Sequence, residues 1–114
     1  NGSTRAAVNR DEDFSHGAVN EARLCRMAAL CRKRGISLVL VATPLRPSYR
    51  AEQNPAQTAD MHRRIERVAA RFPQTVRFLD FAADPAFTAN DFYDADHLNR
   101  AGAAKLSLKV KGAI

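Results

Sequence analysis

An aspartate and a histidine near the end of this chain are the residues best suited to do chemistry. Asp94 and His97 lie three positions apart in the segment Phe92-Tyr93-Asp94-Ala95-Asp96-His97-Leu98-Asn99. A turn of this length can fold the carboxylate back onto the ring, so that one imidazole nitrogen is held and the other can take up a proton. We expect Asp96 to be the poorer partner, because the side chains of adjacent residues diverge. The spacing predicts an oriented general base, although polar residues of an ordinary turn have the same composition.

The residues after His97 indicate how this loop is held. Asn99 is a good N-cap residue, whose side-chain oxygen can accept a backbone N–H of the helix that follows. Leu98 can pack back on the first turn as a hydrophobic staple. We therefore predict a helix from about Arg100 to the end. Its tail, Lys105–Lys111, alternates with a period of two and is also compatible with an edge strand, but the capped, alanine-rich start favours the helix.

The segment Asp94-Ala95-Asp96-His97-Leu98-Asn99, followed by Gly102-Ala103, resembles the last sequence block of the SGNH/GDSL hydrolase superfamily. In that block, an Asp and a His three positions apart complete a Ser-His-Asp triad. The stretch from Gly35 to Pro44 also resembles a late buried strand of that fold, which runs into a proline-containing loop beside the site. The resemblance implies that His97 is the general base and Asp94 its orienting acid.

The same resemblance implies a function. The chain would be part of a serine esterase or O-acyltransferase that acts on acyl esters, above all acetyl esters, with acylated carbohydrates as substrates. The resemblance implies a location in the cell envelope or another extracytoplasmic site of a bacterium. Arg46, Tyr49 and Arg50, in the loop after the first strand, would line the substrate side of the site, although ordinary surface-loop chemistry explains them as well. No cofactor and no metal ion are implied. The alternative is a non-catalytic α/β interaction module, or a degenerate relative of the family.

The serine of the triad is not evident. In the family it follows the first strand in a Gly-Asp-Ser-like motif, whereas Ser3 has no strand ahead of it. Four further serines lie in segments unlike that motif: Ser15, Ser37, Ser48 and Ser107. Asn90-Asp91 is similar to part of the family's Gly-x-Asn-Asp block, but Thr88 stands in the place of the glycine, so we interpret it as an ordinary loop pair. We expect the serine to come from a missing N-terminal part of the fold or from another chain, and this chain alone to be inactive.

Hydrophobic patterns and helix signals predict the elements that position the site. A helix is expected over 18–34, stopped by Gly35, and a continuous apolar strand, covered on both faces, over 36–42. After a loop over 43–53, a second helix begins with a capping Asn54 and Pro55 and ends before Pro73. A second strand over 76–81 leads into the loop that carries the acids and His97.

This order predicts an α/β fold with two parallel strands joined by a right-handed crossover. Two strands covered on both faces do not make a stable sheet. We therefore expect a three-layer, flavodoxin-like (SGNH-type) parallel sheet, of which this chain is only the C-terminal part. The predicted organisation is a flexible N-terminal segment over 1–17 and the C-terminal part of the domain over 18–114. Catalytic groups gather where parallel strands end, so the loops after both strands should meet near His97.

The composition is that of an ordinary globular chain: 114 residues, 46% hydrophobic, with a net charge of +6. It contains no apolar run long enough for a membrane span. Arginines crowd the second helix, but aromatic residues for base stacking are lacking, so a solvated basic face is favoured and no nucleic-acid partner is expected. Cys25 and Cys31 fit neither a redox nor a zinc motif and are expected to be small buried residues. His16 and His62 have no further metal-ligating residue at a suitable spacing, so no metal site is expected there.

Overall fold

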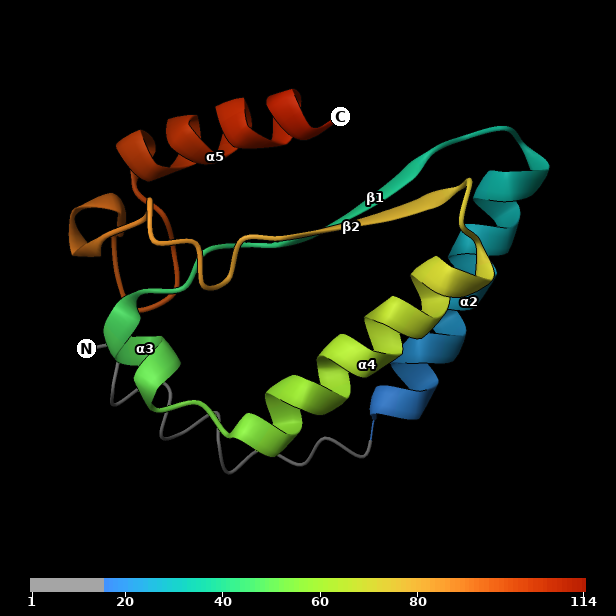
Figure 1. The fold of residues 1–114 in the computed structure, drawn as a ribbon, viewed down its shortest axis with the longest axis horizontal. Helices are drawn as coiled ribbons and strands as arrows, with labels where there is room; N and C mark the ends of the chain where they lie inside the picture. Colours follow the sequence, from blue (N-terminus) through green and yellow to red (C-terminus); the bar gives the residue numbers. More distant parts are fainter. Residues whose placement is uncertain (1–15) are drawn as a thin grey trace. The chain divides into compact units, whose positions relative to one another are not determined.

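The computed structural model describes residues 16–114, which form a small α/β structure with helices flanking a two-stranded parallel sheet (Figure 1). Residues 1–15 of the predicted N-terminal segment lie outside the described residues, as do Ser3 and Ser15, and Gly17 already begins a helix. The elements are α2 (Gly17–Lys33), β1 (Leu38–Ala42), α3 (Pro47–Ala51), α4 (Pro55–Arg71), β2 (Val76–Asp80), the 3-10 helix η1 (Ala89–Asp91) and α5 (Arg100–Ala113). The predicted α/β class is confirmed. No described helix is long and apolar enough to cross a membrane.

The two strands are parallel because their hydrogen bonds advance in the same direction. The N–H of Leu38 donates to the Thr75 carbonyl, and the N–H of Phe81 donates to the Ala42 carbonyl. The predicted strand over 36–42 starts later than expected, at Leu38, whose N–H bonds to Thr75, the residue just before β2. Ile36 therefore has no counterpart on β2 and is 53% exposed.

The chain divides into two compact units, each described here by itself. One, the α2–α4 unit, contains residues 16–40 and 54–78 of the described chain. Its core is built by four buried residues, Ala28, Val68, Phe72 and Val76. Leu38 and Leu40 of β1 pack against this core.

The prediction that β1 is covered on both faces is wrong for this chain. None of its five residues is buried, and Val41 is exposed. Leu38 and Leu40 share the face that meets the α2–α4 core, whereas Val39 and Val41 belong to the opposite face, because side chains alternate along a strand.

The other unit, the α5 unit, contains residues 41–53 and 79–114. It holds the segments that leave the carboxyl ends of both strands, as well as α5. The predicted loop over 43–53 contains a short helix, α3, which begins with Pro47. Its Tyr49 is buried against Ala95 and Leu45. The last element is helical throughout, which confirms the helix over the edge strand.

Candidate active site

Asp94 and His97 are in direct contact, as their spacing predicts. Nδ1 of His97 lies 2.9 Å from Oδ1 and 3.1 Å from Oδ2 of Asp94. The imidazole is 65% exposed and the Asp94 side chain 36% exposed. An imidazole that donates from Nδ1 presents Nε2 as its basic nitrogen. The pair therefore has the geometry of an acid that orients a base.

The carboxylate of Asp94 also organises the backbone around it. Its Oδ1 accepts the N–H of Asp96 at 3.1 Å and the N–H of His97 at 2.9 Å. The hydrogen bond with the imidazole is the largest cause that lowers the pKa of the Asp94 carboxyl; partial burial opposes it, and the two backbone N–H groups lower the pKa further. Asp94 is thus held ionised beside the ring.

Asp96 lies closer to the ring than predicted. Its Oδ1 is 3.1 Å from Nδ1 of His97, so the expectation that adjacent side chains diverge is wrong here. Asp94 remains the carboxylate that makes a hydrogen bond with good geometry to Nδ1. The cluster of Asp94, Asp96 and His97 also brings three ligand atoms within 4.8 Å of one another, a set with which a divalent cation can be coordinated.

The loop that carries the pair is closed at its base. Phe92 and Leu98 form an antiparallel β-bridge, and the N–H of Tyr93 donates to the His97 carbonyl at 2.7 Å. At the middle of the loop, Ala95 is buried against Tyr49 of α3. The histidine therefore projects from a short closed loop, not from an open tail.

Asp91 fixes this loop to α5, a role that the sequence interpretation missed. Its buried carboxylate accepts from Lys105 Nζ at 2.8 Å and from the Thr88 N–H at 2.9 Å. The hydrogen bond from Lys105 is the largest cause that lowers the pKa of Asp91. Lys105 Nζ also donates to the Ala86 carbonyl at 2.8 Å. Asp91 is therefore not an ordinary loop residue, and the Thr88-x-x-Asp91 capping-box pattern was the signal that could have revealed it.

The start of α5 lies tightly against this segment. Asn99 caps the helix as predicted, accepting the Gly102 N–H at 2.9 Å, and its amide donates to the Asn90 carbonyl at 2.7 Å. The Asn99 N–H donates to the Asp91 carbonyl. A Cβ atom at Gly102 would clash with that carbonyl oxygen and would also meet Leu98, so only glycine fits there. This packing fixes the chain two residues after His97.

The predicted substrate-binding residues lie in and beside α3. Tyr49 is only 9% exposed and packs against Ala95, between Asp94 and Asp96 in the sequence. The structure thus brings Tyr49 to the Asp94–His97 loop, but chiefly as a packing residue. Arg46 is half-buried at the N-cap of α3. A substrate-binding role for Arg46 and Tyr49 stays a prediction.

Three of the serines that the sequence analysis judged unlike the family's nucleophile lie within the described residues. Ser37 stands just before β1 instead of inside it, Ser48 lies in α3 and Ser107 lies in α5. Both cysteines are free and half-buried, not fully buried as expected. His62 stacks edge-on against Phe78 at 5.7 Å between ring centres. These positions add no further member to the candidate site.

Searches of the whole chain against protein-family models, curated proteins and solved structures found no match. The functional argument therefore depends on the geometry of the site.

Proposed function

We propose that Asp94 and His97 are the acid and base of a Ser-His-Asp triad in an SGNH-type serine esterase or O-acyltransferase. The observation that carries this proposal is the 2.9 Å contact between Nδ1 of His97 and Asp94 on a ring that is 65% exposed. An ionised carboxylate on one side of an accessible imidazole is the arrangement that a general base requires.

The chemistry follows from that arrangement. Nε2 of His97 takes the proton of a serine hydroxyl while the serine oxygen bonds to the acyl carbon of an ester. His97 then returns the proton to the departing alcohol as the ester C–O bond breaks. Water or an acceptor hydroxyl releases the acyl group by the same steps in reverse, which gives hydrolysis or transfer. Asp94 stabilises the imidazolium formed each time.

The surroundings of the pair support the proposal. The segments that leave β1 and β2 at their carboxyl ends belong to the same unit as the pair, and such ends are where α/β sheets place their sites. The apolar strand β1, which is only partly covered, supports a larger, three-layer sheet, of which 18–114 is the C-terminal part. The serine and the oxyanion donors come from outside these residues.

The proposed substrates are short acyl esters, such as acetyl esters of carbohydrates in the cell envelope. Arg46 and Tyr49 remain the proposed substrate-binding residues, because Tyr49 packs beside the loop of Asp94 and His97. No cofactor is needed for this chemistry.

The test is fluorophosphonate labelling of the longest natural polypeptide that contains this chain. His97→Ala is expected to slow labelling of the serine severely, and Asp94→Asn by roughly 10⁴-fold, the cost of removing the acid from a comparable triad. His16→Ala is the matched control, since His16 is exposed and belongs to the other unit. Asp96→Asn separates the two neighbouring acids and should have a much smaller effect.

A labelling rate that is unchanged by His97→Ala would refute the proposal and favour the non-catalytic module. The isolated chain of 114 residues is expected to show no labelling. Labelling of Ser37, Ser48 or Ser107 in the isolated chain would contradict the claim that the nucleophile comes from elsewhere.

A further inference from the structure

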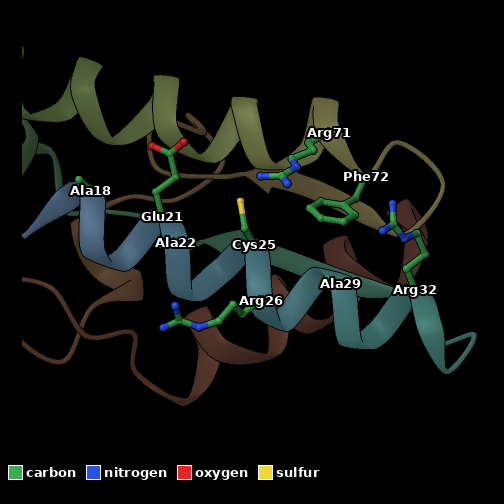
Figure 2. A pocket seen from close by; sticks show the side chains of 9 residues that line it. All are labelled: Ala18, Glu21, Ala22, Cys25, Arg26, Ala29, Arg32, Arg71 and Phe72. Carbon is green, nitrogen blue, oxygen red and sulfur yellow. The ribbon is translucent and has the colours of Figure 1, made fainter.

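A second feature belongs to the α2–α4 unit and is built from residues other than those used above. Helices α2 and α4 border an open groove of about 520 Å³. Its lining is apolar in the middle, with Cys25 and Ala29, and includes the arginines Arg26, Arg32 and Arg71 (Figure 2). A groove of this size falls in the range of small-molecule sites.

At one end of the groove, two arginines of α4 bind the carboxylate of Glu21. Arg67 of α4 binds Glu21 of α2 with two hydrogen bonds, from Nε at 3.0 Å and from Nη2 at 2.7 Å. Arg64 adds a third, from Nη1 at 3.1 Å. The hydrogen bond with Arg67 is the largest cause that lowers the pKa of Glu21. Here two guanidinium groups share one oxyanion.

At the other end, a second arginine pair has no carboxylate partner among residues 16–114. The guanidinium carbon of Arg32 lies 4.8 Å from the centre of the Phe72 ring, and that of Arg71 lies 5.6 Å from it. Figure 2 shows the two groups on either side of this ring. Within residues 16–114, neither guanidinium forms an ion pair with a carboxylate.

Both guanidinium groups are exposed in the last turns of α2 and α4, so an anion from solution can reach them. Two cations that converge on one ring repel each other, and the ring's negative faces offset this only in part. Guanidinium groups bind phosphate and carboxylate oxygens in pairs of hydrogen bonds, as Arg67 does with Glu21. Arg26, which also lines the groove, adds a third positive charge.

We propose that Arg32 and Arg71 form a binding site for a small ligand with two linked oxyanion groups, one for each guanidinium. A diphosphate is the best-fitting chemistry, because its two phosphoryl groups can engage the arginines on both sides of Phe72. The apolar middle of the groove, at Cys25 and Ala29, then receives a non-polar part of the ligand. This site is independent of the Asp94–His97 chemistry.

The experiment titrates the chain with inorganic pyrophosphate, inorganic phosphate and citrate at fixed ionic strength. The Nε–Hε signals of Arg32 and Arg71 are followed by NMR. Pyrophosphate is expected to shift both signals with one common Kd and to bind more tightly than phosphate. Citrate separates a carboxylate ligand from a phosphate ligand: tighter binding of citrate would overturn the diphosphate assignment.

Three variants locate the binding. Arg32→Gln and Arg71→Gln are each expected to weaken pyrophosphate binding by about tenfold or more, because each removes the guanidinium that binds one phosphoryl group. Arg71→Lys, which keeps the charge but not the planar fork, should weaken it less than Arg71→Gln. Arg23→Gln is the matched control, because Arg23 is exposed on α2 and does not line the groove.

The proposal is wrong if Arg23→Gln weakens binding as much as Arg32→Gln. It is also wrong if pyrophosphate shifts all arginine signals alike, because both results indicate attraction to net charge. Unchanged far-ultraviolet circular dichroism of each variant shows that lost binding is not lost folding.

Discussion

The carboxylate of Asp94 links the ionisation of one residue to the stability of its loop. Because its pKa is lowered in the folded protein, ionised Asp94 favours folding at pH values above its pKa in the unfolded chain. This contribution is lost as the pH falls through the lower, folded value. The excess stability should therefore be present at neutral pH and absent in strong acid.

Removing the imidazole tests this link. In His97→Ala, the pKa of Asp94 is expected to rise toward its ordinary value, because the largest cause of its lowering is gone. NMR titration of the Asp94 carboxyl carbon measures this directly. His16→Ala should leave the pKa of Asp94 unchanged, and an equal shift in both variants would contradict a specific contact.

Two glycines of α5 form a matched pair for a second prediction. Gly102→Ala is expected to destabilise the protein by about 1–3 kcal/mol, because its Cβ meets the backbone carbonyl of Asp91. Gly112→Ala has open space and should be neutral or stabilising by at most about 1 kcal/mol. Urea unfolding measures both. Equal effects would show that the close approach at Gly102 does not exist.

At the residue level, the sequence predicts contacts that are local. The contact between Asp94 and His97 needs only one turn of chain, so their spacing was sufficient. The ion pair between Asp91 and Lys105 joins residues on different elements, and it depends on how α5 returns over the loop. That return, and with it the burial of Asp91, is a tertiary feature that no spacing rule provides.

Among the elements, the helix ends that carry a capping Asn or a terminating Gly were predicted well. Asn54 accepts from the N–H groups of Ala56 and Gln57, and Asn99 caps α5, as their positions indicated. Gly35 ends the first helix region with a φ of +67°. In contrast, α3 was missed, because a helix of five residues depends on the packing of Tyr49 against Ala95 more than on its own propensity.

The attachment of α5 to the preceding loop should depend on pH. Lys105→Met removes the largest cause that lowers the pKa of Asp91, so it is expected to lower the urea midpoint at pH 7. The sign follows from a lowered pKa: the ion pair stabilises the fold above the unfolded pKa of Asp91 and is lost as the pH falls through the folded value. The difference between wild type and variant should therefore shrink in acid.

Lys111→Met is the control for this prediction, because Lys111 is exposed on the same helix. Its urea midpoint should follow that of the wild type at every pH. A difference for Lys105→Met that does not shrink in acid would show that the lysine acts through its other bond, to the Ala86 carbonyl, and not through Asp91.

For the whole molecule, the sheet is the least complete part. Two strands rarely suffice for independent stability, and β1 is apolar without being buried. The sequence correctly predicts parallel strands and the α/β class. It cannot predict how much of each strand is covered, because an apolar run is the same whether or not a neighbour lies against it.

Uncovered apolar strand surface should cause self-association. The chain is expected to form larger species as its concentration rises, and Val41→Lys should reduce this, because a charge on a strand opposes pairing between copies. Sedimentation velocity over a range of concentrations measures the effect. Leu108→Lys is the control, a similar change at an exposed residue of α5. If Leu108→Lys reduces association more than Val41→Lys, the strand is not the contact.

The side chain of Asp94 holds both the turn and the imidazole ring of its loop. Three donors, the imidazole and the N–H groups of Asp96 and His97, share the same side chain of Asp94. Asp94→Ala therefore damages the turn and the ring orientation at once, whereas Asp94→Asn keeps an oxygen for the two backbone N–H groups. A substitution at His97 removes the ring but leaves the turn its two backbone bonds. His97→Ala and Asp94→Asn therefore separate chemistry from architecture, whereas inactivation by Asp94→Ala does not distinguish a lost acid from a lost loop.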